Sequence, residues 1–294
     1  MLSGVHLLLT YKCDRECDHC FVFAGPGAKG TFTLAQVREV LTQAKRVPSV
    51  TGVYFEGGEP FLFYAVMLEG TRAARQMDLT AGIVTNGYWA TSVEDAGVWV
   101  KPLAEAGLSK LCVSDDALHY GEEDGSRGRN ASEAAERLGV PVNLMPTQAP
   151  SVGTGEDGRP VVCGGVMFRG RAVERLAADV PLRPASEFTR CPHEDLRDPA
   201  RVHVDAYGNV HLCQGLLMGN AWQTPLDRLV TEFDPDADPV LGPLLAGGPV
   251  ALAEAYGVEL APGYVDACHF CYEVRKALRD RFPDRLAPPQ IYGL

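Results

Sequence analysis

The chain has 294 residues, of which 46% are hydrophobic and 22% charged, a composition typical of a globular protein that buries a real core. Its formal net charge of −11 argues against a nucleic acid or an anionic membrane as partner, because both bind basic surfaces. No apolar run approaches the about 20 residues that span a bilayer, and the first residues lack the basic and apolar regions of a signal peptide. We therefore expect a cytoplasmic protein.

Strand and helix patterns alternate over the first 180 residues. Such alternation is typical of a parallel sheet with right-handed crossovers. Six strand–helix units are too few for a closed eight-stranded barrel, so the sequence predicts an α/β fold with a partial, TIM-like (β/α)6 barrel. The predicted strands are 5–10, 53–55, 81–85, 108–114, 140–145 and 161–168, and the predicted helices are 34–44, 64–77, 93–106, 131–138 and 172–178.

The pattern changes near residue 180. The segments 201–205 and 210–213 predict a hairpin that turns at Gly208-Asn209, and two or three helices follow. We therefore expect two domains. Residues 1–180 form the barrel domain, and residues 181–294 form a small α+β domain.

Three cysteines lie on one short loop after the first predicted strand. Cys13, Cys17 and Cys20 have the spacing C-x3-C-x2-C. In a reducing compartment, clustered cysteines more often bind metal than form disulfides. Three thiolates can hold three irons of a 4Fe–4S cluster and leave the fourth iron open to a substrate or cofactor. Structural zinc is the alternative, with His19 as the fourth ligand.

This loop resembles the C-x3-C-x-aromatic-C signature of the radical S-adenosylmethionine (SAM) superfamily, with His19 in place of the usual aromatic residue. Gly57-Gly-Glu-Pro60 resembles the family's GGEP motif, and Ser114 with Asp116 resembles its Ser-x-Asp pattern. The resemblance implies that SAM binds the open iron through its amino and carboxylate groups. Reductive cleavage then yields methionine and a 5′-deoxyadenosyl radical, which abstracts a hydrogen atom from the substrate.

The resemblance also assigns a set of residues to the SAM site. They follow the first four predicted strands, and the carboxyl ends of such strands meet at one end of a barrel. Glycines allow the backbone to approach a ligand closely, and a carboxylate can pair with the SAM ammonium group. The alternative for each motif is an ordinary turn or a helix cap. The assigned residues are His19, Gly57, Gly58, Glu59, Pro60, Asn86, Ser114 and Asp116.

Four further cysteines lie in the second predicted domain: Cys191, Cys213, Cys268 and Cys271. The hairpin that carries Cys213 resembles the SPASM and twitch extensions of radical SAM enzymes, in which a hairpin and a helix present cysteines to auxiliary clusters. A SPASM domain needs more cysteines for its two clusters. The resemblance therefore implies one auxiliary 4Fe–4S cluster with four cysteine ligands, and structural zinc is the alternative.

Two cysteines remain. Cys112 lies within an apolar strand and is predicted to be a core residue. Cys163 lies near the last predicted strand of the barrel, 161–168, and is expected either in the core or facing the substrate. It is the one candidate for a catalytic side chain, and the sequence assigns no other residue to that role.

The sequence leaves the reaction open. The favoured hypothesis is maturation of a ribosomally made peptide or of a protein. The alternatives are dehydrogenation of a small alcohol or sugar and, in another class, a non-catalytic iron- or zinc-binding scaffold. The first strand begins within five residues of Met1, so we expect no N-terminal peptide-recognition domain. An external electron donor such as flavodoxin or ferredoxin is expected as a partner.

Overall fold

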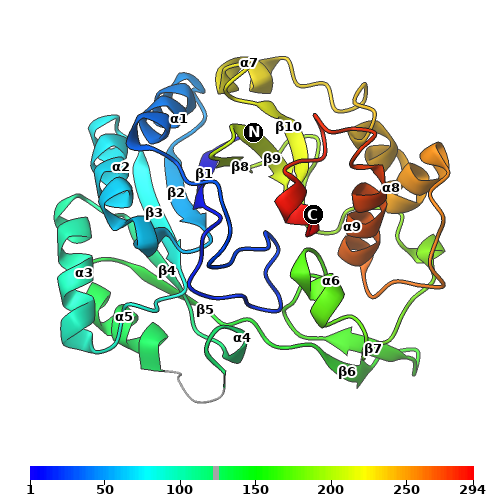
Figure 1. The fold of residues 1–294 in the computed structure, drawn as a ribbon, viewed down its shortest axis with the longest axis horizontal. Coiled ribbons are helices and arrows are strands. Elements are labelled where there is room, and N and C mark those ends of the chain that lie inside the picture. Colours follow the sequence, from blue (N-terminus) through cyan, green and yellow to red (C-terminus); the bar gives the residue numbers. More distant parts are fainter. Residues whose placement is uncertain (122–125) are drawn as a thin grey trace.

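The protein is built on one open, eight-stranded sheet, in a computed structural model that describes residues 1–121 and 126–294 (Figure 1). The strand order is β10-β9-β8-β1-β2-β3-β4-β5, and β8 and β1 to β5 all run parallel. The strands are β1 (Gly4–Thr10), β2 (Gly52–Gly57), β3 (Thr80–Thr85), β4 (Lys110–Ser114), β5 (Val142–Met145), β8 (Arg201–Asp205), β9 (Asn209–Cys213) and β10 (Leu216–Asn220).

Helices connect the parallel strands and cover the outer face of the sheet (Figure 1). The first begins at a capping box, in which the Thr33 side chain accepts from the Gln36 amide and the Gln36 side chain accepts from the Thr33 amide. In chain order they are α1 (Leu34–Arg46), η1 (Pro60–Phe63), α2 (Tyr64–Gln76), α3 (Val93–Glu105), α4 (Ala117–Tyr120), α5 (Ser126–Arg137), α6 (Arg171–Arg175), η2 (Ala185–Glu187), α7 (Leu226–Thr231), α8 (Leu241–Tyr256), α9 (Ala267–Leu278) and η3 (Pro289–Tyr292).

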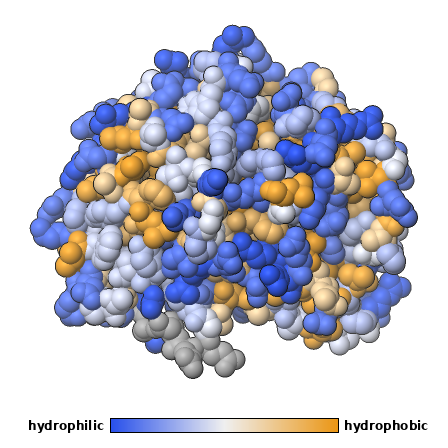
Figure 2. Space-filling model, viewed as in Figure 1, coloured by the Kyte–Doolittle hydropathy of each residue, from blue (hydrophilic) through white to orange (hydrophobic). Residues whose placement is uncertain are grey.

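A continuous apolar core lies between this sheet and its helices. Leu7, Val53, Ile83 and Val204, from four neighbouring strands, are all fully buried. The face seen in Figure 2 is mainly hydrophilic, with hydrophobic patches scattered over it. Across the described residues, no helix is long and apolar enough to cross a membrane.

The α/β class and the largely parallel sheet are confirmed, but the sixth predicted strand is wrong. Within 161–168 only β7 (Pro160–Cys163) is a strand, and it pairs antiparallel with β6 (Ser151–Thr154), away from the main sheet. The turn between them is closed locally, because the Gly155 amide donates to the Arg159 carbonyl at 2.8 Å. The segment therefore folds back on its neighbour instead of extending the sheet beside β5.

The sixth parallel strand is β8, which the sequence predicted only as half of a hairpin. The hairpin of β8 and β9 is present, and β8 also pairs in parallel with β1, so that His203 lies opposite His6. One sheet thus contains strands from both predicted domains. The division at residue 180 stays a prediction.

Candidate functional site

The loop that carries the first three cysteines follows β1 and is held from several sides. The Cys13 amide donates to the Gly25 carbonyl at 3.1 Å, and the amide of Ala24 donates to Cys20 Sγ at 3.3 Å. From far along the chain, the Arg171 guanidinium donates to the carbonyls of Cys17, at 2.9 Å, and Ala24, at 2.7 Å. No spacing pattern points to Arg171, because it lies about 150 residues from the loop it fixes.

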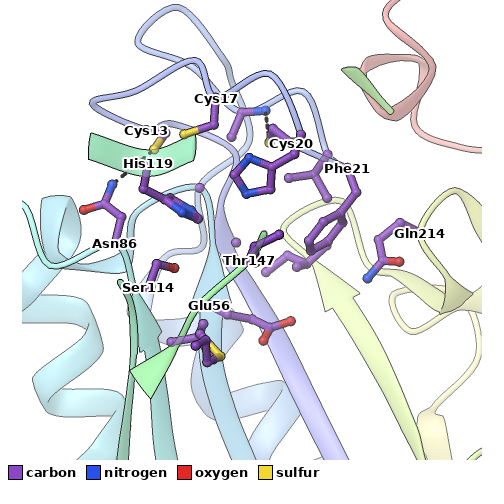
Figure 3. A pocket seen from close by; sticks show the side chains of 18 of the residues that line it. Cys13, Cys17, Cys20, Phe21, Glu56, Asn86, Ser114, His119, Thr147 and Gln214 are labelled. Carbon is purple, nitrogen blue, oxygen red and sulfur yellow. Dashed lines mark hydrogen bonds between the residues drawn. The ribbon is translucent and has the colours of Figure 1, made fainter. Parts of the chain in front are cut away.

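A cavity of about 610 Å³ lies beneath this loop, at the carboxyl ends of the parallel strands. In Figure 3 the cysteines lie at one end of the cavity and Glu56 at the other. Eight of the predicted site residues line it, namely Cys13, Cys17, Cys20, His19, Gly57, Gly58, Asn86 and Ser114. Three do not, namely Glu59, Pro60 and Asp116, although they lie directly behind the wall.

Glu59 is completely buried. Its Oε1 accepts hydrogen bonds from the Phe61 amide at 2.9 Å and the Thr85 hydroxyl at 2.8 Å, and its Oε2 accepts from the Asn86 amide at 2.7 Å. Burial raises the pKa of Glu59 to about 7, against the effect of these three donors. The carboxyl group therefore holds the turns after β2 and β3 together, and its direct pairing with SAM stays a prediction.

The Asn86 side chain extends this arrangement to the cysteine loop. Its Nδ2 donates to Asp14 Oδ1 at 2.7 Å and to Cys13 Sγ at 3.7 Å. Since the Asn86 backbone is fixed by Glu59, the carboxyl group acts on the first cysteine through Asn86.

The two glycines of the GGEP segment allow the turn after β2 to pack against the cysteine loop. The Gly58 amide donates to the Thr10 carbonyl at 2.6 Å. A Cβ on Gly58 would lie 2.2 Å from the Lys12 carbonyl oxygen, and one on Gly57, which has φ +127°, would lie 2.4 Å from the Thr10 oxygen. Only glycine fits this contact.

Asp116 caps α4, which is the alternative that the sequence left open for it. Its Oδ1 accepts from the His119 amide at 3.1 Å and lies 2.9 Å from His119 Nδ1, and its Oδ2 accepts from the Thr147 amide at 3.1 Å. His119 and Thr147 line the cavity, together with Ser114. Asp116 thus positions two groups of the wall.

The three thiols suit a cluster better than zinc. Tetrahedral zinc with bonds of about 2.3 Å needs sulfurs about 3.8 Å apart. In residues 1–121 and 126–294, no three metal-ligand atoms that include a cysteine thiol lie within 4.8 Å of one another, whereas a cluster binds each thiolate on a separate iron. Burial lowers the pKa of His19 to about 4, and its buried Nδ1 has no partner. The neutral ring faces the cavity and can bond to a ligand there.

The other four predicted cluster ligands also meet. Cys191, Cys213, Cys268 and Cys271 line one small cavity. Cys213 ends β9, and Cys268 and Cys271 share one face of α9, since they are three residues apart. No three of these four thiols lie within 4.8 Å of one another, as a compact metal site would require.

Two buried arginines, Arg169 and Arg275, line the same small cavity together with the exposed Arg190, and the sequence did not single them out. Arg169 Nη1 donates to Cys213 Sγ at 3.1 Å, and Arg275 Nη1 donates to the Gln214 carbonyl at 2.9 Å. Both guanidinium groups are buried, and their positive charge favours thiolates over thiols. This donor set fits an anionic cluster. Arg169 also lines the large cavity, so its side chain forms part of the wall between the two.

Cys163 is not a core residue. It is exposed in β7 and does not line the large cavity. Cys112 is buried as predicted, and it also lines the cavity, which its apolar strand pattern did not indicate.

Among the polar side chains of the cavity wall that the sequence analysis missed, His6, Glu56 and His203 lie together. His6 Nδ1 lies 3.2 Å from Glu56 Oε2, and His203 Nε2 lies 2.9 Å from Glu56 Oε1. His6 and Glu56 could have been found from the sequence, because each is a polar residue within or directly after a strand that was predicted to be buried. The pairing of β8 with β1, which brings His203 to them, could not be read from local pattern.

Residues 7–122 match the model of the Radical SAM superfamily. This chain carries a radical SAM domain. The chain is also 22% identical over 147 residues to YydG of Bacillus subtilis (strain 168), a protein named for peptide biosynthesis, and the match covers 49% of this chain and 46% of YydG. The chain thus spans less than half of the length of YydG.

Solved structures similar to this chain include BtrN in an open conformation and anSMEcpe with bound AdoMet. For BtrN the TM-score is 0.44 at 15% identity, covering 78% of this chain and 79% of the other. For anSMEcpe the TM-score is 0.47 at 13% identity, covering 96% and 97%.

Proposed function

We propose that this chain is a radical SAM enzyme that acts on a ribosomally made peptide or a protein. The observation that carries the proposal is one cavity lined by Cys13, Cys17, Cys20 and the glycines of the GGEP turn. Its volume of about 610 Å³ lies within the roughly 300–1,000 Å³ of small-molecule sites. The peptide class is supported by the likeness to YydG, which is named for peptide biosynthesis.

Cys13, Cys17 and Cys20 would hold a 4Fe–4S cluster with one iron open to SAM. When bound, the cluster and SAM would supply a 5′-deoxyadenosyl radical that removes a hydrogen atom from the substrate. The chain binds and orients these groups. Gly57 and Gly58 bring the backbone close, while the Ser114 hydroxyl, the Asn86 amide and the neutral His19 ring offer polar contacts from the wall. Glu59, Pro60 and Asp116 support these groups from behind.

The rest of the wall would protect a reactive intermediate from water. Leu8, Val22, Val84, Val166 and Met167 line the cavity, and apolar surfaces of this kind limit solvent access during a reaction. A radical reacts with its intended hydrogen atom only if other hydrogen-atom donors are kept away from it. We therefore assign this apolar face to holding the substrate in position.

We further propose that Cys191, Cys213, Cys268 and Cys271 hold one auxiliary 4Fe–4S cluster, as in a twitch-like domain. The spread of the thiols and the buried guanidinium groups of Arg169 and Arg275 support a cluster over zinc. Protein reconstituted without oxygen should then bind about eight irons per chain. About four irons with one retained zinc would contradict the auxiliary cluster. A flavodoxin or ferredoxin of the cytoplasm would supply the electron.

The peptide class is tested with a synthetic peptide that corresponds to the short reading frame nearest this gene, deuterated on its side chains. Incubation with the reduced protein and SAM should transfer deuterium into 5′-deoxyadenosine and change the mass of the peptide. A variant with Cys13, Cys17 and Cys20 replaced by Ala is the control. Unlabelled 5′-deoxyadenosine and an unchanged peptide would contradict this substrate, and transfer from a deuterated sugar or alcohol would favour dehydrogenation.

A further inference from the structure

Three metal-binding side chains converge on the cavity wall away from the cysteines. His6 lies on β1, Glu56 on β2 and His203 on β8, which are neighbouring strands of the sheet. His6 pairs in register with His203 on one side and with Tyr54 on the other. Because every second residue of a strand faces the same way, Glu56 lies on the same face as Tyr54. The sheet therefore brings two imidazoles and a carboxylate to one place.

Their separations match those of ligands around one ion. The three ligand atoms all lie within 4.8 Å of one another, with contacts of 3.2 Å between His6 Nδ1 and Glu56 Oε2 and 2.9 Å between His203 Nε2 and Glu56 Oε1. Metal bonds of about 2.0–2.2 Å to nitrogen and oxygen put neighbouring ligand atoms roughly 3–3.5 Å apart. No three thiols of the two predicted cluster sites meet this limit.

The immediate surroundings of the trio favour a cation. Glu56 contacts the two imidazoles. Arg201 lies on the same wall but is paired with Glu194, to which its Nη2 donates at 3.2 Å, so its positive charge does not neutralise Glu56. His203 is 5% exposed, yet its Nδ1 has no hydrogen-bond partner, so hydrogen bonding alone does not account for this buried ring. The His6 ring is held by stacking on Tyr54, with centroids 4.7 Å apart. A carboxylate with two neutral imidazoles is a donor set suited to a divalent ion.

We infer that His6, Glu56 and His203 bind one divalent first-row transition-metal ion, such as Zn²⁺ or Fe²⁺. Two histidines and one carboxylate form a ligand set that leaves positions open. The open positions would face the cavity and take an oxygen or sulfur atom of the substrate, as a Lewis acid does. The metal site stands on its own geometry, whereas its role toward a substrate rests on the proposed function.

The test measures zinc on the complete, cluster-loaded protein. The protein is reconstituted without oxygen, incubated with a small excess of Zn²⁺, desalted and analysed for zinc and iron. Wild type should keep about one zinc per chain beyond its iron. His203→Ala and Glu56→Gln should each lower zinc retention at least tenfold, because each removes one of three ligands. His119→Ala, which removes an imidazole from the same cavity but not from the trio, should retain zinc.

Two further readings separate the possible outcomes. Unchanged iron content in each variant shows that the fold and clusters survive, so that lost zinc reflects the site itself. 5′-Deoxyadenosine is measured in the same samples. Wild type that cleaves SAM but keeps no zinc, or variants that keep zinc like wild type, would overturn the metal site alone. Zinc binding without SAM cleavage would contradict the proposed function and leave the metal site standing.

Discussion

At the scale of single residues, Glu59 should act on SAM through the turn that it holds. Glu59→Gln replaces one acceptor oxygen by a donor opposite the amides of Phe61 or Asn86. Loss of such a charge-assisted bond costs the turn roughly 1–3 kcal/mol, so SAM affinity should fall by no more than about 5- to 150-fold. Anaerobic calorimetry checks this, with Glu69→Gln on α2 as the matched control. A wild-type affinity in Glu59→Gln would mean that the Asn86 position does not depend on this carboxyl group.

The same carboxyl group predicts a pH dependence of stability. Burial raises the pKa of Glu59 from the usual 4.5 to about 7 in the fold, so between these two pH values the native state holds a proton that the unfolded chain has lost. The native protein is therefore favoured at low pH, and this contribution is lost as pH rises from about 4.5 to 7, by roughly 3 kcal/mol. Denaturant unfolding of wild type and Glu59→Gln across this window measures it. Parallel pH profiles would show that Glu59 titrates normally.

Arg169 should tune the redox potential of the proposed auxiliary cluster. Its guanidinium donates to Cys213 Sγ at 3.1 Å, and a positive charge beside a cluster stabilises the reduced, more negative form. We expect Arg169→Gln to lower the midpoint potential by roughly 50–100 mV, since 59 mV is a tenfold change for one electron. Electron paramagnetic resonance during a redox titration measures this. Arg175→Gln, exposed on α6, is the control, and a shift of equal size in both variants would exclude a specific effect of Arg169.

At the scale of elements, the turn after β2 and the cysteine loop should behave as one unit. A Cβ on Gly58 would lie 2.2 Å from the Lys12 carbonyl oxygen, so Gly58→Ala must displace the loop that carries Cys13. Iron should fall from about eight to about four per chain, with the auxiliary cluster kept. Gly97→Ala on α3, where a Cβ meets nothing within 4 Å, should keep all the iron. Full iron and normal SAM affinity in Gly58→Ala would contradict this coupling.

At the scale of the whole molecule, local sequence patterns predicted the elements that form between residues close together in the chain. The capping box that begins α1 and the first five parallel strands follow from residues close together in the chain, and so does the hairpin of β8 and β9. The pairing of β8 with β1 joins segments about 200 residues apart, and no periodicity encodes it. For that reason the sixth strand was expected at 161–168, and His203 was not expected near His6.

The candidate site divides in the same way. Short-range spacing identified the first cysteine set, whereas the resemblance of the hairpin to SPASM and twitch extensions implied the second, and each set lines one cavity. Arg169 and Arg171 were missed because they act on residues far away in the sequence. Glu59 and Asp116 were predicted as SAM contacts, and the structure shows them bonded to the backbone of neighbouring turns. The motifs thus predicted that these residues lie near the site, but not which atoms their side chains contact.

The most direct test of the radical SAM proposal is the cleavage of SAM itself. Protein reconstituted without oxygen and reduced with dithionite should convert SAM into methionine and 5′-deoxyadenosine. The variant with Cys13, Cys17 and Cys20 replaced by Ala should form neither product while keeping about four irons in the auxiliary site. Wild-type protein that holds about eight irons and binds SAM, yet never forms 5′-deoxyadenosine, would contradict the account and favour a non-catalytic scaffold.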